Sequence, residues 1–210
     1  MPRPRFAKLP PARREQILDT AAREFGLHGF EDASLNHILA AAGLSKGAAY
    51  YYFDDKADLF VATVRHFWEH FLAHTGIATI GLDRDSFWPR VVELYRHALD
   101  HYRADPALLG VAKAVWRLAP ESRREGRVAE LFGWARDQLA AVVHQGQQVG
   151  AIRRDLPDEL LLGVVLALDE AADRWTLEHA DQLETAHVEE VLTRLLAGVR
   201  LLLAPPEDAS

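Results

Sequence analysis

The sequence has no cysteine and no apolar run of the roughly 18 residues that a transmembrane helix needs. The first absence excludes disulfides, thiol catalysis and thiolate metal ligands, and the second excludes a membrane span. No apolar stretch follows the basic residues of positions 1–6, which argues against a secretion signal. Strand patterns are nearly absent, whereas apolar residues recur at helical spacing throughout. These absences predict an all-α protein that does not enter a membrane.

The acidic residues are concentrated in the second part of the chain. The 210 residues carry a net charge of −7. Residues 1–56 hold eight lysines and arginines against seven acidic residues, whereas residues 57–210 hold 16 against 24. Five basic residues precede the first acidic one, namely Arg3, Arg5, Lys8, Arg13 and Arg14. This basic arm can follow a phosphate backbone or enter a minor groove, or it can be a solvated, disordered tail.

Residues 34–53 have the pattern of two short helices joined at Gly43. Ser34 and Ser45 stand where the helices begin, and a serine hydroxyl there can cap free backbone N–H groups. The same helix starts can also receive a phosphate oxygen. Gly43 can adopt the left-handed conformation that ends a helix tightly.

The second of these helices has an inner and an outer face. Ala49 and Phe53 are four residues apart and are expected to face inward. Lys46, Tyr50 and Tyr51 then point outward, which places one cation and two phenols on a short exposed helix. This arrangement indicates a helix-turn-helix whose second helix enters the major groove of double-stranded DNA.

The spacing of apolar residues predicts about nine helices and a disordered tail over residues 205–210. The expected helices cover residues 11–27, 34–41, 45–51, 56–75, 87–103, 106–118, 124–148, 158–179 and 186–203.

Residues 34–60 resemble the N-terminal signature of TetR-family transcriptional regulators. The preceding segment fits as well, since Ile17, Ala21 and Phe25 share one helical face and Gly29 follows it. The resemblance implies a three-helix DNA-binding domain over residues 1–56, followed by a larger helical domain over residues 57–204 for effector binding and dimerisation. It further implies a homodimeric repressor, located in the cytoplasm, that a small apolar or aromatic effector releases from a palindromic operator.

The predicted DNA-binding residues combine the exposed face of the second helix with positions taken over from the family. By similarity, Tyr50 and Lys56 hold the phosphate backbone. Two departures from the family pattern reduce the number of side chains that can make the expected capping and base contacts. His37 stands where the family usually has a capping acid, and Ala48 offers only a methyl contact. The full set is Ser34, His37, Ser45, Lys46, Ala48, Tyr50, Tyr51 and Lys56.

The resemblance also implies a small-molecule pocket in the helices between residues 56 and 179. Aromatic side chains are available to line it, although each of them can equally be a core residue. Asp169, Glu170 and Asp173 lie near Trp175 and could attract a cation, or form a solvated or interfacial acidic patch. The candidate pocket residues are Phe67, Trp68, Phe71, Trp88, Tyr95, Trp116, Trp134 and Trp175.

The last two predicted helices carry long apolar faces. Such a pair can form the centre of a single subunit's core, or half of a four-helix interface between two subunits, which is the arrangement that the resemblance implies. The candidate interface residues are Leu161, Val165, Leu168, Leu192, Leu195, Leu196 and Val199.

A histidine cluster offers an alternative function. His66, Glu69 and His70 match the inverted zinc-peptidase pattern His-x-x-Glu-His, and His74 follows one turn later. Histidines four residues apart share a helix face, so a metal-responsive regulator is a second hypothesis and a zinc peptidase a remote one. No phosphate loop, nucleophile elbow or dinucleotide fingerprint occurs. We therefore expect no catalytic residue, no resident metal and no cofactor.

Overall fold

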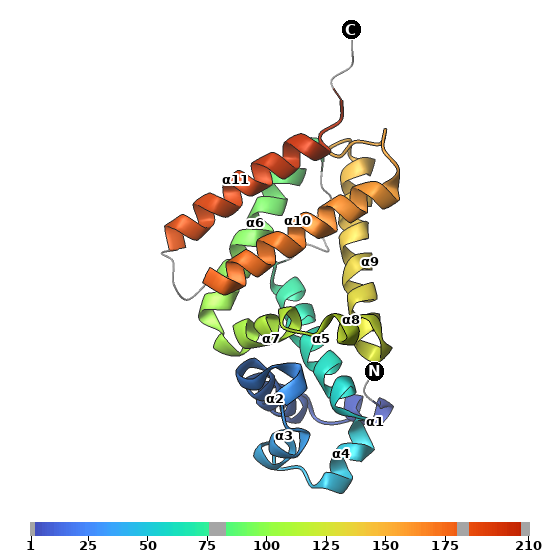
Figure 1. The fold of residues 1–210 in the computed structure, drawn as a ribbon, viewed down its shortest axis with the longest axis vertical. Helices are drawn as coiled ribbons and strands as arrows, with labels where there is room; N and C mark the ends of the chain where they lie inside the picture. The colour runs from blue at the N-terminus through green and yellow to red at the C-terminus, as the bar shows by residue number, and fades with distance from the viewer. Residues whose placement is uncertain (1–2, 76–82, 180–184, 207–210) are drawn as a thin grey trace. The chain divides into compact units, whose positions relative to one another are not determined.

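The computed structural model describes residues 3–75, 83–179 and 185–206, and these ranges contain helices and no strand (Figure 1). The predicted all-α class is therefore confirmed, and none of the helices in these ranges is long and apolar enough to cross a membrane. The helices are α1 (Pro4–Ala7), α2 (Pro11–Asp32), α3 (Leu35–Ala41), α4 (Lys46–Tyr52), α5 (Lys56–Thr75), α6 (Arg84–Ala104), α7 (Pro106–Trp116), α8 (Pro120–Arg124), α9 (Gly126–Gln148), α10 (Asp158–His179) and α11 (Thr185–Leu203).

Two short helices account for the difference between about nine predicted helices and the eleven in the described ranges. Helices α1 and α8 have four and five residues, too few to show a helical period, and each has proline in its first turn. Helix α2 is interrupted at Gly29, whose φ of 74° is non-helical. The break lies two residues beyond the predicted end of this helix at residue 27, and α2 continues over residues 30–32.

The chain forms two compact units. Unit 1 comprises residues 1–71 and 102–133, and unit 2 comprises residues 72–101 and 134–210. The predicted boundary at residue 56 separates a DNA-binding domain from an effector-binding and dimerisation domain. This assignment of functions to the two domains stays a prediction.

Unit 1 is built around α2. Ile17, Phe25 and Phe60 are fully buried, and the rings of Phe25 and Phe60 meet edge to face with centroids 4.9 Å apart. Helix α2 also crosses α7 with Gly26 against Gly110. A β-carbon built on Gly26 would lie only 2.8 Å from the Gly110 Cα atom. Two glycines thus allow the two helix backbones to approach closely.

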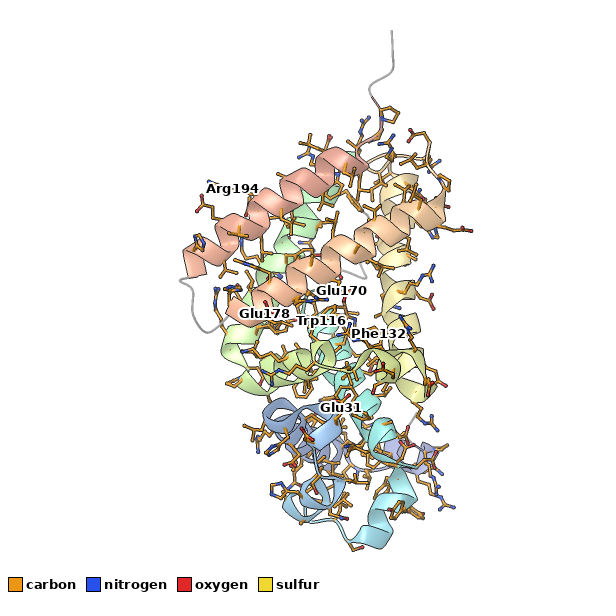
Figure 2. The ribbon with its side chains drawn as sticks, in the orientation of Figure 1. Glu31, Trp116, Phe132, Glu170, Glu178 and Arg194 are labelled. Atoms are coloured by element: carbon orange, nitrogen blue, oxygen red, sulfur yellow. The ribbon has the colours of Figure 1, made fainter. Side chains whose placement is uncertain are left out.

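Polar contacts join α2 to α8 within the same unit. The Glu31 carboxylate, labelled in Figure 2, accepts the Ala119 N–H at 3.1 Å and the Ser122 hydroxyl at 3.3 Å. The Arg123 guanidinium lies 5.5 Å from the centroid of the Trp116 ring. The contacts of Glu31 hold the α7–α8 segment against α2, and the contact of Arg123 joins α8 to α7.

Unit 2 has two apolar clusters. The first brings Phe87 and Trp88 of α6 together with Leu161 of α10 and Leu203 of α11. Its Trp88 indole N–H donates to the Ala151 carbonyl at 3.3 Å. The second cluster consists of Leu99, Ala172, Val188 and Leu192, with Trp175 and Leu195 packed against it. Helices α10 and α11 therefore bury part of their apolar faces within their own subunit.

Candidate nucleic-acid interface

The turn between α3 and α4 has the geometry that its sequence predicts. The Ser34 hydroxyl accepts the His37 N–H at 3.3 Å, so it caps α3. Gly43 has a φ of 63°, and the Leu44 N–H donates to the Leu39 carbonyl at 2.8 Å, as in a tight helix end. The Arg13 guanidinium donates to the Gly43 carbonyl at 3.2 Å and so ties the turn to α2.

Glu24 of α2 supplies the carboxylate that α3 itself does not carry. Its Oε1 accepts the Ser34 N–H at 3.0 Å, and its Oε2 lies 2.6 Å from Nδ1 of His37. In a capping box, an acidic or amide side chain at the third residue of the helix accepts the backbone N–H of the N-cap residue. Here Glu24 of another helix accepts that N–H instead. Sequence reasoning missed this role. The available signal was a charged residue at position 24, on the same face of α2 as Ile17 and Phe25.

The surroundings of Glu24 favour its charged form. Burial raises the pKa of its carboxyl, but the Ser34 N–H, the hydrogen bond and charge of His37, and the charge of His28 together outweigh burial, so its pKa is lowered overall. A group with a lowered folded-state pKa stabilises the fold above its unfolded pKa, and this contribution is lost as the pH falls.

Glu24→Gln is therefore expected to lower the free energy of unfolding by about 1–2 kcal/mol at neutral pH, because a buried charge-assisted hydrogen bond is lost. The difference from the wild type is expected to shrink below about pH 5, where the wild-type carboxyl also becomes neutral. Urea unfolding from neutral to acidic pH measures it. Glu15→Gln on the same helix is the matched control, since Glu15 is exposed and its carboxylate forms no hydrogen bond or ion pair with the described residues. A constant difference at every pH would contradict the assignment.

Helix α4 exposes two of the predicted contact residues. The side chains of Tyr50 and Tyr51 are 50% and 46% exposed, and Ser45 at the helix start is exposed as well. Tyr52 is half-buried, with its ring centroid 6.1 Å from that of Phe6 and 5.2 Å from that of Tyr51. The side chains of the predicted contacts Lys46 and Ala48 lie outside the described residues.

The basic arm is ordered where the structure describes it, so the disordered-tail interpretation is wrong for residues 3–8. Phe6 is buried, with its ring centroid 4.8 Å from that of Phe53. The Arg3 N–H donates to the Tyr52 carbonyl at 2.9 Å, and the Arg5 guanidinium lies 4.3 Å from the Tyr51 ring centroid. Helix α1 therefore packs against α4, which the spacing of basic residues alone could not indicate.

Lys56 has structural partners. Its ammonium group donates to the carbonyls of Glu31 and Ala33 at 2.7 and 3.1 Å, and it lies 5.0 Å from the Phe30 ring centroid. The lysine thus joins the start of α5 to the end of α2. Its predicted contact with a phosphate stays a prediction.

An ion-pair cluster surrounds the junction of α4 and α5. Asp54 pairs with Arg3 at 2.7 Å and with Arg127 at 3.0 Å, and Nε of Arg127 lies 3.5 Å from Oδ1 of the buried Asp58. The hydrogen bond and charge of Arg3, with a smaller contribution from Arg127, hold the pKa of Asp54 below its ordinary value. Two cations from distant parts of the chain thereby meet at the end of α4.

The predicted effector-pocket residues are divided between the units. Phe67, Trp68, Phe71 and Trp116 belong to unit 1, and Trp88, Tyr95, Trp134 and Trp175 belong to unit 2. Each keeps the role of a pocket residue as a prediction, although Trp88 and Phe71 are buried in the described core.

Unit 2 also contains a pair of acidic residues on α10. The Tyr95 hydroxyl donates to Asp169, and burial raises the pKa of Asp169 more than this hydrogen bond lowers it. Burial and the neighbouring Asp169 raise the pKa of Asp173 well above its ordinary value. Asp169 is thus paired with Tyr95 and is not simply part of a solvated patch.

The predicted interface residues already pack within the subunit to different degrees. Leu161, Leu192 and Leu196 are buried, so most of their apolar surface is covered without a second subunit. The half-buried members are Val165, Leu168, Leu195 and Val199. Leu160 and Leu201, which were not among the predicted residues, are 54% and 80% exposed. An interface on these helices would therefore include outward-facing side chains that the apolar pattern did not single out.

The structure does not support the metal hypothesis in the residues that it describes. The rings of His66 and His70 have centroids 6.3 Å apart, and no group of three potential ligands in the described ranges could hold an ion. The side chain of His74 lies outside the described residues. The zinc-peptidase interpretation depends on the same histidines, and the described residues do not support it either.

Comparisons with known proteins agree with this geometry. Residues 17–63 match the sequence profile described as "Bacterial regulatory proteins, tetR family". An HTH-type transcriptional repressor of Mycobacterium tuberculosis is 31% identical over 153 residues, which are 71% of this chain and 74% of that protein.

Solved structures show a similar fold. Bacillus subtilis FadR in complex with stearoyl-CoA has a TM-score of 0.68 and 16% identity, over 88% of this chain and 97% of that one. The complex of SmeT with triclosan has a TM-score of 0.70 and 19% identity, over 94% and 93% of the two chains. At these identities the structural likeness concerns the fold alone.

Proposed function

Since this chain belongs to the tetR family of bacterial regulatory proteins, we propose that it acts as a homodimeric repressor that an apolar or aromatic effector releases from a palindromic operator. The family is one of transcriptional regulators, and we propose no catalytic activity. We propose that it acts in the cytoplasm, where operator DNA is present. The observation that supports the DNA-binding role best is the capped α3, the left-handed turn at Gly43 and the exposed Tyr50 and Tyr51 of α4.

The proposed mechanism is a shift between two states of the dimer. Each subunit contributes one α4, so the two-fold axis requires half-sites about one helical turn, roughly 34–36 Å, apart. An effector that prefers a dimer with a different spacing lowers operator affinity by the free energy of that preference. Stearoyl-CoA and triclosan in the two similar folds have large apolar parts, and they motivate the proposed effector class. Outward-facing Leu160 and Leu201 are proposed to join the interface between subunits.

Selection of operators from random duplexes tests this function. The full chain is expected to enrich a two-fold symmetric sequence, and light scattering is expected to give the mass of two subunits. A compound that raises the thermal midpoint is expected to weaken retardation of that duplex. Enrichment of no sequence would remove the DNA-binding function, and a single-subunit mass would remove the symmetric mechanism.

A further inference from the structure

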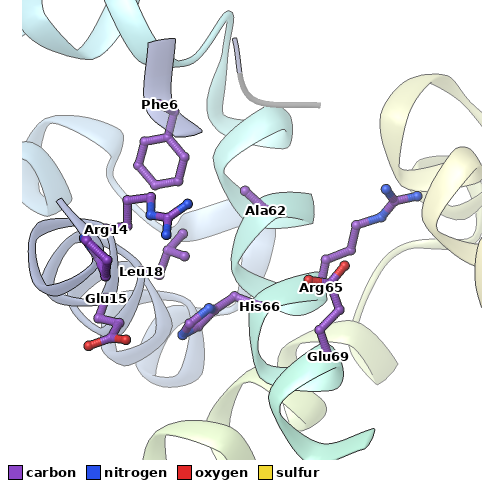
Figure 3. Close-up of a pocket in the computed structure, with 9 residues that line it drawn as sticks. Phe6, Arg14, Glu15, Leu18, Ala62, Arg65, His66 and Glu69 are labelled. Atoms are coloured by element: carbon purple, nitrogen blue, oxygen red, sulfur yellow. The ribbon is translucent and has the colours of Figure 1, made fainter. Parts of the chain in front are cut away.

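Charged side chains lie along α5 in two places. Between α2 and α5 is a hollow of about 370 Å³, shown in Figure 3. The charged residues that border it are Arg14, Glu15, Arg65 and Glu69. Charges of both signs line this hollow, so it favours neither a cation nor an anion. At the first turn of α5, by contrast, charged groups from distant parts of the chain meet around the carboxylate of Asp58.

The Arg127 guanidinium bridges two carboxylates at this turn. Its Nη2 lies 3.0 Å from Oδ2 of Asp54, and its Nε lies 3.5 Å from Oδ1 of Asp58. Asp58 is fully buried, whereas Asp54 is exposed. A guanidinium is planar and its donors point in fixed directions, so a single arginine can hold two carboxylates in a defined relation to each other. All three residues belong to unit 1.

The two carboxylates belong to the connection between α4 and α5. Asp54 follows the end of α4 after the buried Phe53, and Asp58 lies in the first turn of α5. The Asp54 N–H donates to Oδ2 of Asp58 at 3.3 Å, and the Asp58 N–H donates to Oδ1 of Asp55 at 2.7 Å. The connection is therefore a short hydrogen-bonded segment, and Arg127 contacts it from another helix.

Arg127 lies far outside the predicted DNA-binding domain. It is the second residue of α9, and Val128 beside it and Leu131 one turn later are buried. Buried neighbours fix the backbone of this turn, so the Arg127 side chain extends from a defined position. Because the carboxylate of Asp58 is buried, the contact also differs from an ion pair on the surface, which contributes little to stability.

We propose that Arg127 is a positioning residue for operator binding, which holds α4 in its DNA-binding orientation by bridging Asp54 and Asp58. This inference rests on the repressor function proposed above. Loss of the bridge lets the end of α4 turn relative to α5, so a smaller fraction of the molecules presents Tyr50 and Tyr51 to the major groove. Operator affinity falls in proportion to that fraction. It therefore depends on a residue that the predicted DNA-binding domain does not include.

Two variants of the full chain test the bridge by retardation of the selected duplex. Arg127→Lys keeps the positive charge and removes the planar set of donors, and it is expected to raise the operator Kd about fivefold. Arg127→Gln is expected to raise the Kd about tenfold, with an unchanged slope of log Kd against log salt. Wild-type affinity in both variants would overturn the proposal. Wild-type affinity in Arg127→Lys with a less steep slope in Arg127→Gln would show a phosphate contact instead, and would also overturn it.

Arg124→Gln is the matched control and should leave the operator Kd unchanged. Arg124 is exposed at the end of α8 and forms no hydrogen bond or ion pair with the described residues. Asp54→Asn removes the bridge from the other side, so it is expected to raise the Kd although it also removes a negative charge next to α4. Since Asp54 and Arg127 share one contact, the double variant should raise the Kd by less than the product of the two single effects. A full product would refute the bridge.

Hydrogen exchange of the free protein separates the position of α4 from the proposed repressor function. Without DNA, the amides of residues 44–53 are expected to exchange about threefold faster in Arg127→Lys than in the wild type, and at the wild-type rate in Arg124→Gln. All measurements are made well below the thermal midpoint of each variant. Normal retardation by the wild type, with unchanged exchange and affinity in Arg127→Lys, refutes this inference and leaves the repressor function intact. If the wild type retards no duplex, the repressor function is removed, and the exchange rates alone decide whether the bridge positions α4.

Discussion

Operator affinity is expected to fall about a thousandfold when Lys46 and Tyr50 are both replaced by alanine. Each dimer then loses four contacts, and each contact contributes about 1 kcal/mol, which together correspond to roughly three powers of ten in Kd. The loss of two lysines per dimer also removes charge, so the slope of log Kd against log salt is expected to become less steep. Retardation of the selected duplex at two salt concentrations measures both effects.

Matched variants separate DNA contact from damage to the fold. Tyr50→Phe keeps the ring of an exposed side chain and removes only its hydroxyl. The operator affinity of this variant therefore measures what the hydroxyl contributes to the free energy of binding. Tyr52→Phe changes a half-buried tyrosine that faces α1, and it is expected to retain nearly full affinity. The double alanine variant should keep the dimer mass and the thermal midpoint of the wild type. Wild-type affinity in that variant would refute the placement of the interface on α4.

Gly26→Ala is expected to lower the free energy of unfolding by about 2 kcal/mol, although alanine is the better helix former. Helix propensity alone predicts a gain of about 1 kcal/mol. The new methyl group would lie 2.8 Å from the Gly110 Cα atom and 3.2 Å from the Gly110 carbonyl carbon, and backbone atoms cannot rotate away as a side chain can. Overpacking costs about 1–3 kcal/mol, and a contact between two backbones lies at the upper end of this range. Subtracting the gain of about 1 kcal/mol in helix propensity leaves a net loss of about 2 kcal/mol. Urea unfolding gives the difference.

A second glycine provides the control. Gly133 of α9 is exposed, and no described atom lies within 4 Å of a β-carbon built on it. Gly133→Ala is therefore expected to stabilise the protein by up to about 1 kcal/mol through helix propensity. Gly110→Ala faces the reciprocal contact, at 2.9 Å from the Gly26 Cα atom, and is expected to destabilise the protein like Gly26→Ala. Stabilisation by Gly26→Ala would show that the crossing is looser than described.

Local interactions explain why α3, the turn and α4 could be predicted from the sequence. A serine cap, a glycine with positive φ and apolar residues four apart act over a few neighbouring residues. The geometry at Ser34 and Gly43 agrees with the cap and with the positive φ. The bounds of α5 and α10 were predicted to the residue for the same reason, since their apolar periods are long.

Contacts between distant residues could not be predicted in this way. Arg127 lies 73 positions from Asp54, and nothing in either neighbourhood indicates the pair. The apolar residues along one face of α11 indicate that this face is buried. They do not indicate whether the same subunit or a second subunit buries it. The buried Leu192 and Leu196 pack within unit 2, whereas Leu201 of the same helix remains 80% exposed.

The contacts of the Glu24 carboxylate couple the substitutions that positions 24 and 37 can accept during evolution. It performs at a distance what an acid at position 37 would perform within α3, and the ring of His37 is hydrogen-bonded to it. Exchange of either residue alone leaves a backbone N–H or a buried charge without its partner. Positions 24 and 37 are therefore expected to change together during divergence. A descendant that acquires an acid at 37 becomes free to replace Glu24 by an apolar residue.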